Sequence, residues 1–434
     1  MARWSTGSTG RFWQLLDAAT ASTCTSSPLP TGPVQISPRS PPACANSPDL
    51  ERGGSTVPAE PQTDMAPATS DRTVSATVRP EPRAQPSRPA DRFALLATTV
   101  VGSYSVPEWL ERLKTDYYQR RISSAYLREI HEVAIKAAIK DQERAGVDIV
   151  SDGELRRDND IDYFLARMPG VEIPHLAKAF YYDYYDAVVS HPIPEPDDTD
   201  RPPLGLIDDF LFTREYTDRP IKFSFTGPFS LSRRVQNQWY RDEADLVMAF
   251  ARILNREARA LAAAGVAVLQ VDEPFLAGYP EQVGLAVRAI NAVFEGVDRT
   301  TLRALHVCYG NRYARPLWEG HYDFLFPAVL DAQVDQLVLE FARKGYEDLD
   351  LFRRYPNAPF SLGLGVIDVK SPAVEPPELV AARVRRALQV LPPDRLMVNP
   401  DCGLRHLPSE VARAKLRALT AGAAMVRKEI LGQA

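Results

Sequence analysis

The stretch that decides the fold lies between residues 221 and 274, where IKFSFTGP (221–228) is followed by ADLVMAFARILNREARALAAAG (244–265) and VAVLQVDEP (266–274). The first and last segments are short runs of apolar and β-branched residues, which are typical of buried strands. The middle segment repeats its apolar residues every three to four positions and stops at Gly265, a residue typical of helix ends. Strand, helix and strand in this order predict a βαβ unit in a parallel sheet.

The same alternation of apolar runs and helical stretches extends in both directions from this unit. PELVAARVRRALQVL (377–391) is predicted as an amphipathic helix that prolines open and Pro392 closes. Eight strands with intervening helices over about 340 residues predict a (β/α)8 TIM barrel with insertions, an α/β fold, over residues 93–434. The predicted strands are residues 96–104, 147–154, 221–228, 266–274, 303–310, 336–342, 360–368 and 395–403.

Residues 168–220 are the main irregularity of this pattern. They include AFYYDYYDAVVSHPIPEPDDTDRPP, which is rich in Tyr, Asp and Pro. Long loops on the functional face of a barrel are commonly lids or substrate walls. We therefore expect an insertion here, although its role is open.

Residues 1–92 have a different character from the rest of the chain. They contain 14 of the 37 prolines, no lysine, and many Ser, Thr and Ala residues without a helical or strand period. Too little apolar content is present to offset chain entropy, so we predict a disordered low-complexity tail. The run FWQLL is too short for a signal-peptide core and Asp17 follows it directly, which favours a dispensable tail or a misplaced start codon over a targeting segment.

Composition narrows the class of protein. A net charge of −5 gives no reason to expect nucleic acid or a membrane surface as a partner. No apolar run approaches the roughly 18–20 residues needed to span a bilayer. Four cysteines in 434 residues do not form a disulfide framework, so a reducing, cytoplasmic location is expected.

Reactive side chains recur at the ends of the predicted strands. In a TIM barrel these ends gather at one face, where the chemistry takes place. A barrel with a purely structural role would have no reason to repeat that placement. The groups are Ser103, Asp152, Glu154, Thr226, Asp272, Glu273, His306, Cys308, Glu340, Asp368, Asp401 and Cys402.

Four of these groups form a candidate metal set. His306 and Cys308 in LHVCYG share one face of a strand, because side chains alternate with period two. Glu340 in LVLEF and Cys402 in NPDCG end two other strands. Two thiolates, an imidazole and a carboxylate suit four-coordinate Zn²⁺. The alternative is coincidence, since a buried cysteine is often only a small apolar residue.

Other motifs are excluded or remain ambiguous. VAVLQVDEP resembles a Walker B strand, but the chain has no GxxxxGK[ST] loop. Gly363 and Gly365 lie within a strand and lack a third glycine, so they do not form a phosphate cradle. There is no GxSxG motif for a serine triad. The DGE segment at 152–154 could be an ordinary turn.

From about Thr98 to Arg427 the chain resembles the catalytic barrel of cobalamin-independent methionine synthase. The resemblance is carried by TTVVGSY, DGELRRDNDIDYF, FTGPFSL, VLQVDEPFL, LHVCYG, LEFARK, GVIDVKSP and above all VNPDCGL, in that order. It implies zinc bound by His306, Cys308, Glu340 and Cys402. It also implies homocysteine contacts at Gly102, Ser103, Glu154 and Asp272.

The implied activity is transfer of a methyl group to the thiol of homocysteine, giving methionine. A thiol bound to such a zinc is ionised at neutral pH and remains nucleophilic. Glu154 and Asp272 would hold the substrate ammonium, and backbone amides near Ser103 its carboxylate. The methyl donor, a folate or a corrinoid, stays open.

The chain departs from the family at the residues that serve the methyl donor. Members with two barrels use the N-terminal one to help hold the folate tail, whereas only residues 1–92 precede the barrel here. The folate-stacking Trp of the family corresponds to Arg234 or a neighbour, and its proton-donating His to Lys370 in DVKSP. We predict Lys370 and Asp368 as catalytic groups, although an ordinary lysine pKa of about 10.4 makes a poor acid.

Three alternatives follow from that difference. The first is a zinc-dependent thiol alkyltransferase of the epoxyalkane–coenzyme M type, which would not need the amino-acid contacts. The second is a non-catalytic binding protein. The third is the related uroporphyrinogen decarboxylase group, which uses the same fold without metal.

Overall fold

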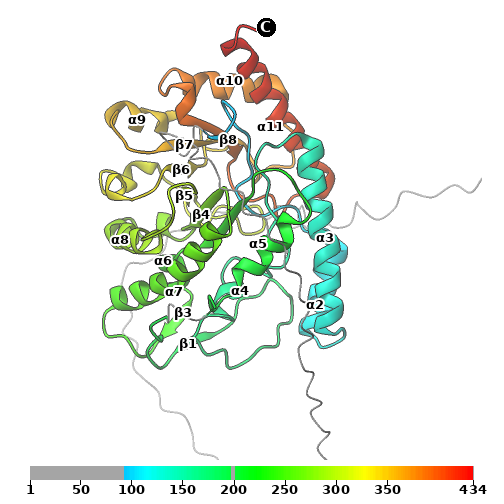
Figure 1. Cartoon of the computed structure of the whole chain (residues 1–434), viewed down its shortest axis with the longest axis vertical. Coiled ribbons are helices and arrows are strands. Elements are labelled where there is room, and N and C mark those ends of the chain that lie inside the picture. Colours follow the sequence, from blue (N-terminus) through cyan, green and yellow to red (C-terminus); the bar gives the residue numbers. More distant parts are fainter. Residues whose placement is uncertain (1–91, 197–200, 434) are drawn as a thin grey trace, which may run out of the picture. The chain divides into compact units, whose positions relative to one another are not determined.

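The computed structural model describes residues 92–196 and 201–433. The prediction of a tail over residues 1–92 therefore lies outside the described residues except for Arg92. The fold is the predicted parallel α/β barrel, with a sheet surrounded by helices (Figure 1).

Six strands form the regular part of the sheet in the order β2-β4-β5-β6-β7-β8, and every neighbouring pair is parallel. The register is continuous at the C-terminal ends of three neighbouring strands: Thr226 pairs with Asp272, and Asp272 pairs with His306. The strands are β2 (Lys222–Thr226), β4 (Val268–Asp272), β5 (Leu302–Val307), β6 (Gln336–Leu339), β7 (Ser361–Ile367) and β8 (Leu396–Pro400).

The first two predicted strands are much shorter than expected and close the ring by single bridges. Thr98 bridges to Val398 of β8, Thr99 to Ile149, and Val150 to Ile221. Strand pairing ends early at the second segment because Gly153 has a φ of +70° and Glu154 a φ of +57°, which turn the chain away from the extended conformation. Parallel segments nevertheless occur at all eight predicted positions.

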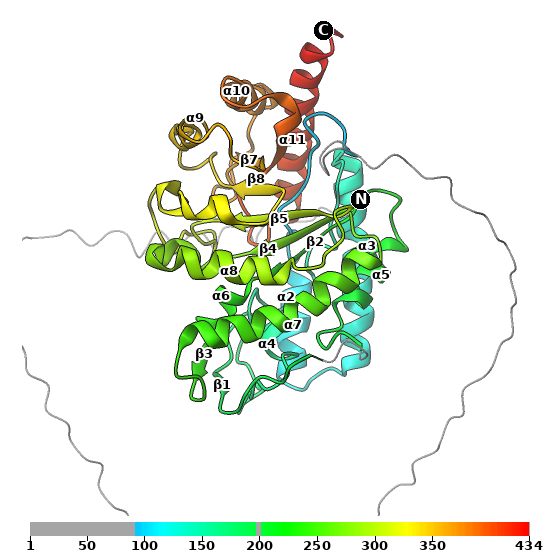
Figure 2. The ribbon, with the colours of Figure 1, turned by 60° about the vertical axis from the view of Figure 1, so that its left-hand side comes forward.

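Helices cover the outside of this ring, as Figures 1 and 2 show. The predicted helix after β2 is α7, and Gly265 follows it with a φ of +92°, as expected of a helix C-terminus. The helices are α2 (Glu108–Tyr118), α3 (Ser124–Ala145), α4 (Asp162–Leu165), α5 (Leu206–Arg214), α6 (Pro228–Ser232), α7 (Glu243–Ala263), α8 (Val283–Val293), α9 (Asp350–Arg354), α10 (Pro377–Leu388) and α11 (Ser409–Ile430).

The apolar residues divide into two clusters. The larger one fills the space between the sheet and the helices, and includes Phe225, Phe250 and Leu416. The smaller one draws almost all its members from strand segments, among them Ala97, Ile149 and Val338. Burial of these groups from water is the main stabilising term of the barrel.

The 168–220 region is only partly an insertion. Its last part contains α5, which follows the second strand segment as a barrel helix should. Its middle part contains β1 (Ala187–Val189), which pairs in parallel with β3 (Val235–Asn237), the strand after α6. This pairing places the tyrosine-rich segment before β1 close to the segment that follows α6.

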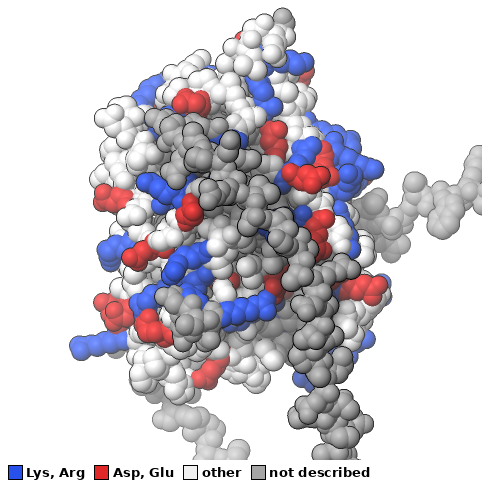
Figure 3. Space-filling model, viewed as in Figure 1, with Lys and Arg blue, Asp and Glu red and all other residues white. Residues whose placement is uncertain are grey.

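The distribution of charged side chains on the surface is consistent with the small net charge of the chain. On the face shown in Figure 3, Lys and Arg side chains are interspersed with Asp and Glu. Among the described residues, no helix combines the length and apolar character that a membrane crossing requires.

Candidate metal and thiol site

Three of the four predicted metal ligands converge at the C-terminal edge of the sheet. His306 lies in β5, Cys308 follows that strand, and Cys402 follows β8. One ligand atom from each of the three lies within 4.8 Å of the other two. The alternating period of β5 and the closure of the barrel therefore bring together side chains that are far apart in the sequence.

The imidazole of His306 is oriented for metal binding. Its Nδ1 lies 2.9 Å from the carbonyl oxygen of Val338, and a carbonyl only accepts, so Nδ1 carries the proton. The tautomer leaves Nε2 as an acceptor, and this buried atom has no hydrogen-bond partner. A buried acceptor without a partner is costly unless a metal or donor satisfies it.

The two sulfur atoms have the spacing of a zinc site. Cys308 Sγ and Cys402 Sγ lie 3.7 Å apart. Two ligands at about 2.3 Å from a tetrahedral Zn²⁺ would be about 3.8 Å apart, whereas a disulfide requires about 2.05 Å. Interaction with Cys308, together with His306 and Lys370, lowers the pKa of Cys402 and favours its thiolate. The donor set and its spacing fit zinc.

The fourth predicted ligand, Glu340, lies just after β6 and outside that group of three. Its Oε2 is 2.6 Å from Lys370 Nζ, and its Oε1 accepts a hydrogen bond from the Tyr309 amide at 3.1 Å. Both side chains of the ion pair are buried. Glu340 therefore remains a predicted ligand, and in this structure Lys370 is its partner.

Asp401 of the NPDCG segment connects two of these strand ends. Its carboxylate accepts hydrogen bonds from the amides of Phe341, Ala342 and Arg343, at 2.8 to 3.0 Å. These are the residues directly after Glu340. The aspartate before Cys402 thus fixes the loop that follows Glu340, which gives it a positioning role.

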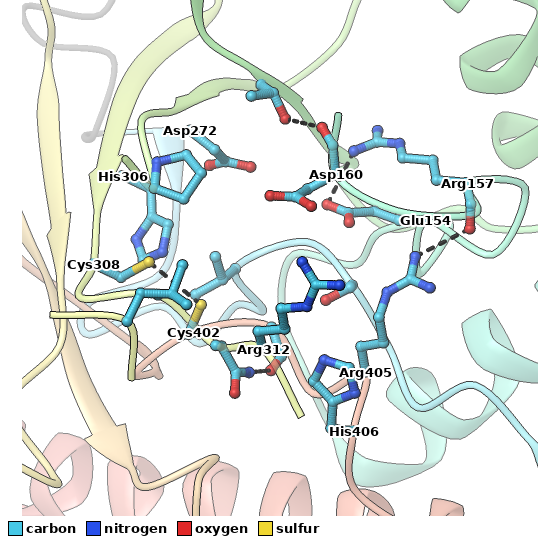
Figure 4. A pocket seen from close by; sticks show the side chains of 18 of the residues that line it. Glu154, Arg157, Asp160, Asp272, His306, Cys308, Arg312, Cys402, Arg405 and His406 are labelled. Atoms are coloured by element: carbon cyan, nitrogen blue, oxygen red, sulfur yellow. Dashed lines mark hydrogen bonds and ion pairs between the residues drawn. The ribbon is translucent and has the colours of Figure 1, made fainter. Parts of the chain in front are cut away.

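Three of the four predicted substrate contacts line a cavity of about 100 Å³, which the three converging ligands also line. Ser103, Glu154 and Asp272 all face it, and Figure 4 shows Glu154 and Asp272 on the side opposite Cys402. Gly102 lies directly behind Glu154, because a Cβ at this position would be 2.1 Å from Glu154 Oε1. Only glycine allows this close approach.

Glu154 is held from several sides. Its Oε1 accepts a hydrogen bond from Ser224 Oγ at 2.6 Å and lies 3.1 Å from Arg157 Nη1. Its backbone amide donates to Asp152 Oδ1 at 2.9 Å, which stabilises the left-handed turn of the DGE segment. A strained backbone held by side-chain contacts is common at functional sites, and this segment has both features.

Asp272 is a buried acid that faces the cavity with a raised pKa. Desolvation is the main reason why its pKa is raised to about 7; His306 opposes this shift and nearby Glu154 adds to it. Gln270 Nε2 donates to its Oδ1 at 2.7 Å. An acid in such surroundings gains from a cationic partner.

The other predicted catalytic groups lie outside this cavity. Lys370 pairs with Glu340, as described above. Asp368 Oδ1 accepts a hydrogen bond from the Lys370 amide at 2.8 Å. Arg234, at the position expected for the aromatic residue, packs its guanidinium 4.2 Å from the ring centroid of Tyr184.

Several cavity residues were missed by the sequence analysis: Arg157, Asp160, Tyr182, Tyr184, Arg312, Arg405 and His406. Most follow a predicted strand end by only a few residues, in DGELRRDND, HVCYGNR and NPDCGLRH. That position was a usable signal. The two tyrosines had no such signal, because they come from the irregular 168–220 region.

Comparison with known proteins gives a consistent result. Residues 96–425 match the family described as the catalytic domain of cobalamin-independent synthase. The methionine synthase of Sulfurisphaera tokodaii is 33% identical over 344 residues, which cover 78% of this chain and 95% of that protein. The methionine synthase of Thermococcus kodakarensis is 34% identical over 337 residues, with coverages of 77% and 95%.

A solved structure agrees with the sequence matches. The B12-independent methionine synthase of a Shewanella species, in complex with selenomethionine, aligns with a TM-score of 0.67 and 29% identity. The alignment covers 78% of this chain and all of the other.

Proposed function

This chain belongs to the cobalamin-independent methionine synthase family, and from that premise we propose that it transfers a methyl group to the thiol of homocysteine at a zinc centre. The observation that supports this most directly is the convergence of His306, Cys308 and Cys402 beside a cavity lined by acids. A thiol substrate with an ammonium group needs both features.

His306, Cys308 and Cys402 would hold the zinc, with Glu340 as the fourth ligand if it leaves Lys370. Zinc bound there would lower the pKa of a substrate thiol and favour its nucleophilic form. The three residues supply ligand atoms that are already oriented, since the tautomer of His306 is fixed by Val338.

The acidic wall would select an amino acid among thiols. Glu154 and Asp272 would bind the ammonium group of homocysteine, and this contact would ionise Asp272. The Ser103 amide, which has no acceptor among the described residues, would bind the carboxylate. Groups that fix both ends of the substrate hold its sulfur in one position for transfer.

We assign Lys370 to the metal half of the site, the part formed by His306, Cys308, Cys402 and Glu340. Burial opposes its charge, but Glu340 and the two cysteines more than offset this and raise its pKa. An ammonium with a raised pKa is an even poorer proton donor than an ordinary lysine. Its role would be to compensate the charge of Glu340, with Asp368 fixing the turn that carries it.

The epoxyalkane–coenzyme M alternative is not favoured. A sulfonate-bearing thiol has no ammonium group, and the carboxylates of Glu154 and Asp272 would repel its charge. The methyl donor, a folate or a corrinoid, is addressed by the experiment below.

The test is methionine formation from homocysteine by the zinc-loaded chain, with methyltetrahydrofolate and methylcobalamin offered in parallel. Product from either donor, together with about one zinc per chain by elemental analysis, supports the proposal. The matched control is Cys402→Ser. Zinc binding without methionine from either donor would contradict the proposed acceptor or donor class, and absence of zinc after reconstitution would contradict the centre itself.

A further inference from the structure

Arg312 differs from the other arginines of the cavity. Arg405 is fully engaged, with its Nη1 and Nη2 donating to the carbonyl oxygens of Asp158 and Arg157 at 3.0 and 3.1 Å. Arg157 uses its two terminal nitrogens on Glu154 and on the carbonyl oxygen of Ser224. The guanidinium of Arg312 has neither a hydrogen bond nor an ion pair to any described residue.

The position of Arg312 is suited to ligand binding. It lies in the loop after β5, four residues beyond Cys308, and lines the cavity. Figure 4 shows its side chain reaching into the space between Cys402 and Arg405. Its side chain is only partly buried, so its nitrogens are accessible from the cavity.

Aromatic rings hold this guanidinium in place. Its Cζ lies 4.6 Å from the ring centroid of Tyr184, 5.6 Å from that of Tyr313 and 5.9 Å from that of Tyr182. Contacts with ring faces orient an arginine and leave its N–H groups free. The rings therefore fix the position of the Arg312 guanidinium, while its N–H groups have no hydrogen-bond acceptor among the described residues.

A second cation lies on the same ring. The guanidinium of Arg234 is 4.2 Å from the Tyr184 centroid, and its Nε is buried without a hydrogen-bond partner. Tyr184 itself is fixed because its hydroxyl donates to Asp160 Oδ1 at 3.0 Å. Two guanidinium groups thus contact one phenol ring, whose hydroxyl meets the single carboxyl group of Asp160, and of the two arginines Arg312 is the one that lines the cavity.

Homocysteine does not account for this charge. Its ammonium is assigned to Glu154 and Asp272, and its carboxylate to the amide of Ser103. The remaining reactant is the methyl donor. Both candidate donors carry oxyanions: glutamate carboxylates in a methyl folate and a phosphodiester in methylcobalamin. Guanidinium binds both kinds of oxyanion through paired N–H groups.

We propose that Arg312 binds an anionic group of the methyl donor, and that Arg234, which contacts the same Tyr184 ring, adds to the positive charge there. The inference rests on the proposed function. It assigns the donor half of the site to a wall built from the β5 loop, the chain after α6 and the tyrosine-rich segment before β1. The Arg234 position, where the family resemblance led us to expect an aromatic residue, then serves charge recognition instead.

The test compares Arg312→Ala and Arg312→Lys with the unmodified zinc-loaded chain in steady-state kinetics. For Arg312→Ala we expect the KM for the donor to rise about tenfold or more, and the KM for homocysteine to change less than about twofold. Arg312→Lys should recover part of the loss, and Arg234→Ala should have a smaller effect. The matched control is Arg353→Ala on α9, an exposed arginine outside the cavity.

The donors used in the assay identify the anion. Methyltetrahydrofolate with one and with three glutamates tests for carboxylates, because the effect of the substitution should grow with tail length. Methylcobalamin and methylcobinamide test for phosphate, because only the former has the phosphodiester. A dependence on either anion supports the proposal. An unchanged donor KM in Arg312→Ala, or a rise in the KM for homocysteine instead, would overturn it.

A direct binding measurement separates this inference from the proposed function. If no donor yields methionine with the unmodified chain, the proposed function fails. Calorimetric titration of each donor into the zinc-loaded chain and into Arg312→Ala still decides the inference. Weaker binding to the variant supports an anion receptor, and equal binding or none to both overturns it.

Discussion

The two halves of the cavity are built in different ways. The proposed metal half comes from the ends of regular strands, with His306 in β5, Cys308 after it and Cys402 after β8. The proposed donor half comes from loops, with Tyr182 and Tyr184 before β1 and Arg312 after β5. Strand register fixes the first half, whereas the second depends on packing between segments that share no regular structure. We expect the first half to tolerate change least.

The largest effect is expected at the metal half. Cys402→Ser replaces a soft ligand with a hydroxyl, so zinc content should fall well below about one per chain and methionine formation should be lost. Elemental analysis and the activity assay measure both. Cys24→Ser and Cys44→Ser serve as controls that should change neither. Full zinc retention by Cys402→Ser would place the metal elsewhere.

Lys370→Met should show which half that residue serves. Removing one partner of the buried pair leaves Glu340 uncompensated, so the free energy of unfolding of the zinc-free chain should fall by about 3–5 kcal/mol. Denaturant titration measures this loss. Zinc should restore part of it if Glu340 then binds the metal. A stable variant that is slow only with one methyl donor would instead assign Lys370 to proton donation.

Glu154→Gln tests the acidic wall of the cavity. Loss of a charged partner for the substrate ammonium should raise the KM for homocysteine by about 10–100-fold. Exposed Glu319→Gln, whose partner is Arg343, is the control. The KM for the donor should stay the same. A parallel rise in both constants would mean that Glu154 supports the whole cavity rather than one substrate.

The pH dependence should report Asp272. Its pKa is raised to about 7, so this carboxylate is largely protonated below that pH and cannot hold an ammonium. As pH falls from 8 to 6, kcat/KM for homocysteine should decrease, approaching about tenfold per unit below the pKa. Asp272→Asn should remove this inflection. An unchanged profile in that variant would assign the inflection to another group.

The smallest effect is expected from Tyr184→Phe in the donor half. The variant keeps the ring that contacts both arginines and removes only the hydrogen bond to Asp160. A loss of about 1 kcal/mol would raise the donor KM about fivefold. Tyr184→Leu, which also removes the aromatic ring, should raise the donor KM further. Equal effects of the two substitutions would show that the ring itself does not orient Arg312.

The sequence predicted the barrel well, and three of the four residues predicted as metal ligands meet in the structure. Alternating patterns and glycine ends identified six regular strands and helices such as α7 and α10. The expected strands at 96–104 and 147–154 were too long: Leu96, at the start of the first, and Gly153 and Glu154, at the end of the second, lie in the left-handed region. The prediction of an insertion at 168–220 missed α5, because this short helix follows a proline-rich segment and its apolar residues do not gather on one face.

What the sequence determined by itself is the order of strands and the chemistry at their ends. A period of two puts His306 and Cys308 on one face, and barrel closure then brings Cys402 to them. Only the tertiary structure decided that Glu340 pairs with Lys370, and that Arg234 and Arg312 meet on Tyr184. The physical reason is that strand ends are placed by a repeating hydrogen-bond ladder. Contacts between loops depend instead on how segments of unequal length pack over one face, and no local pattern records that packing.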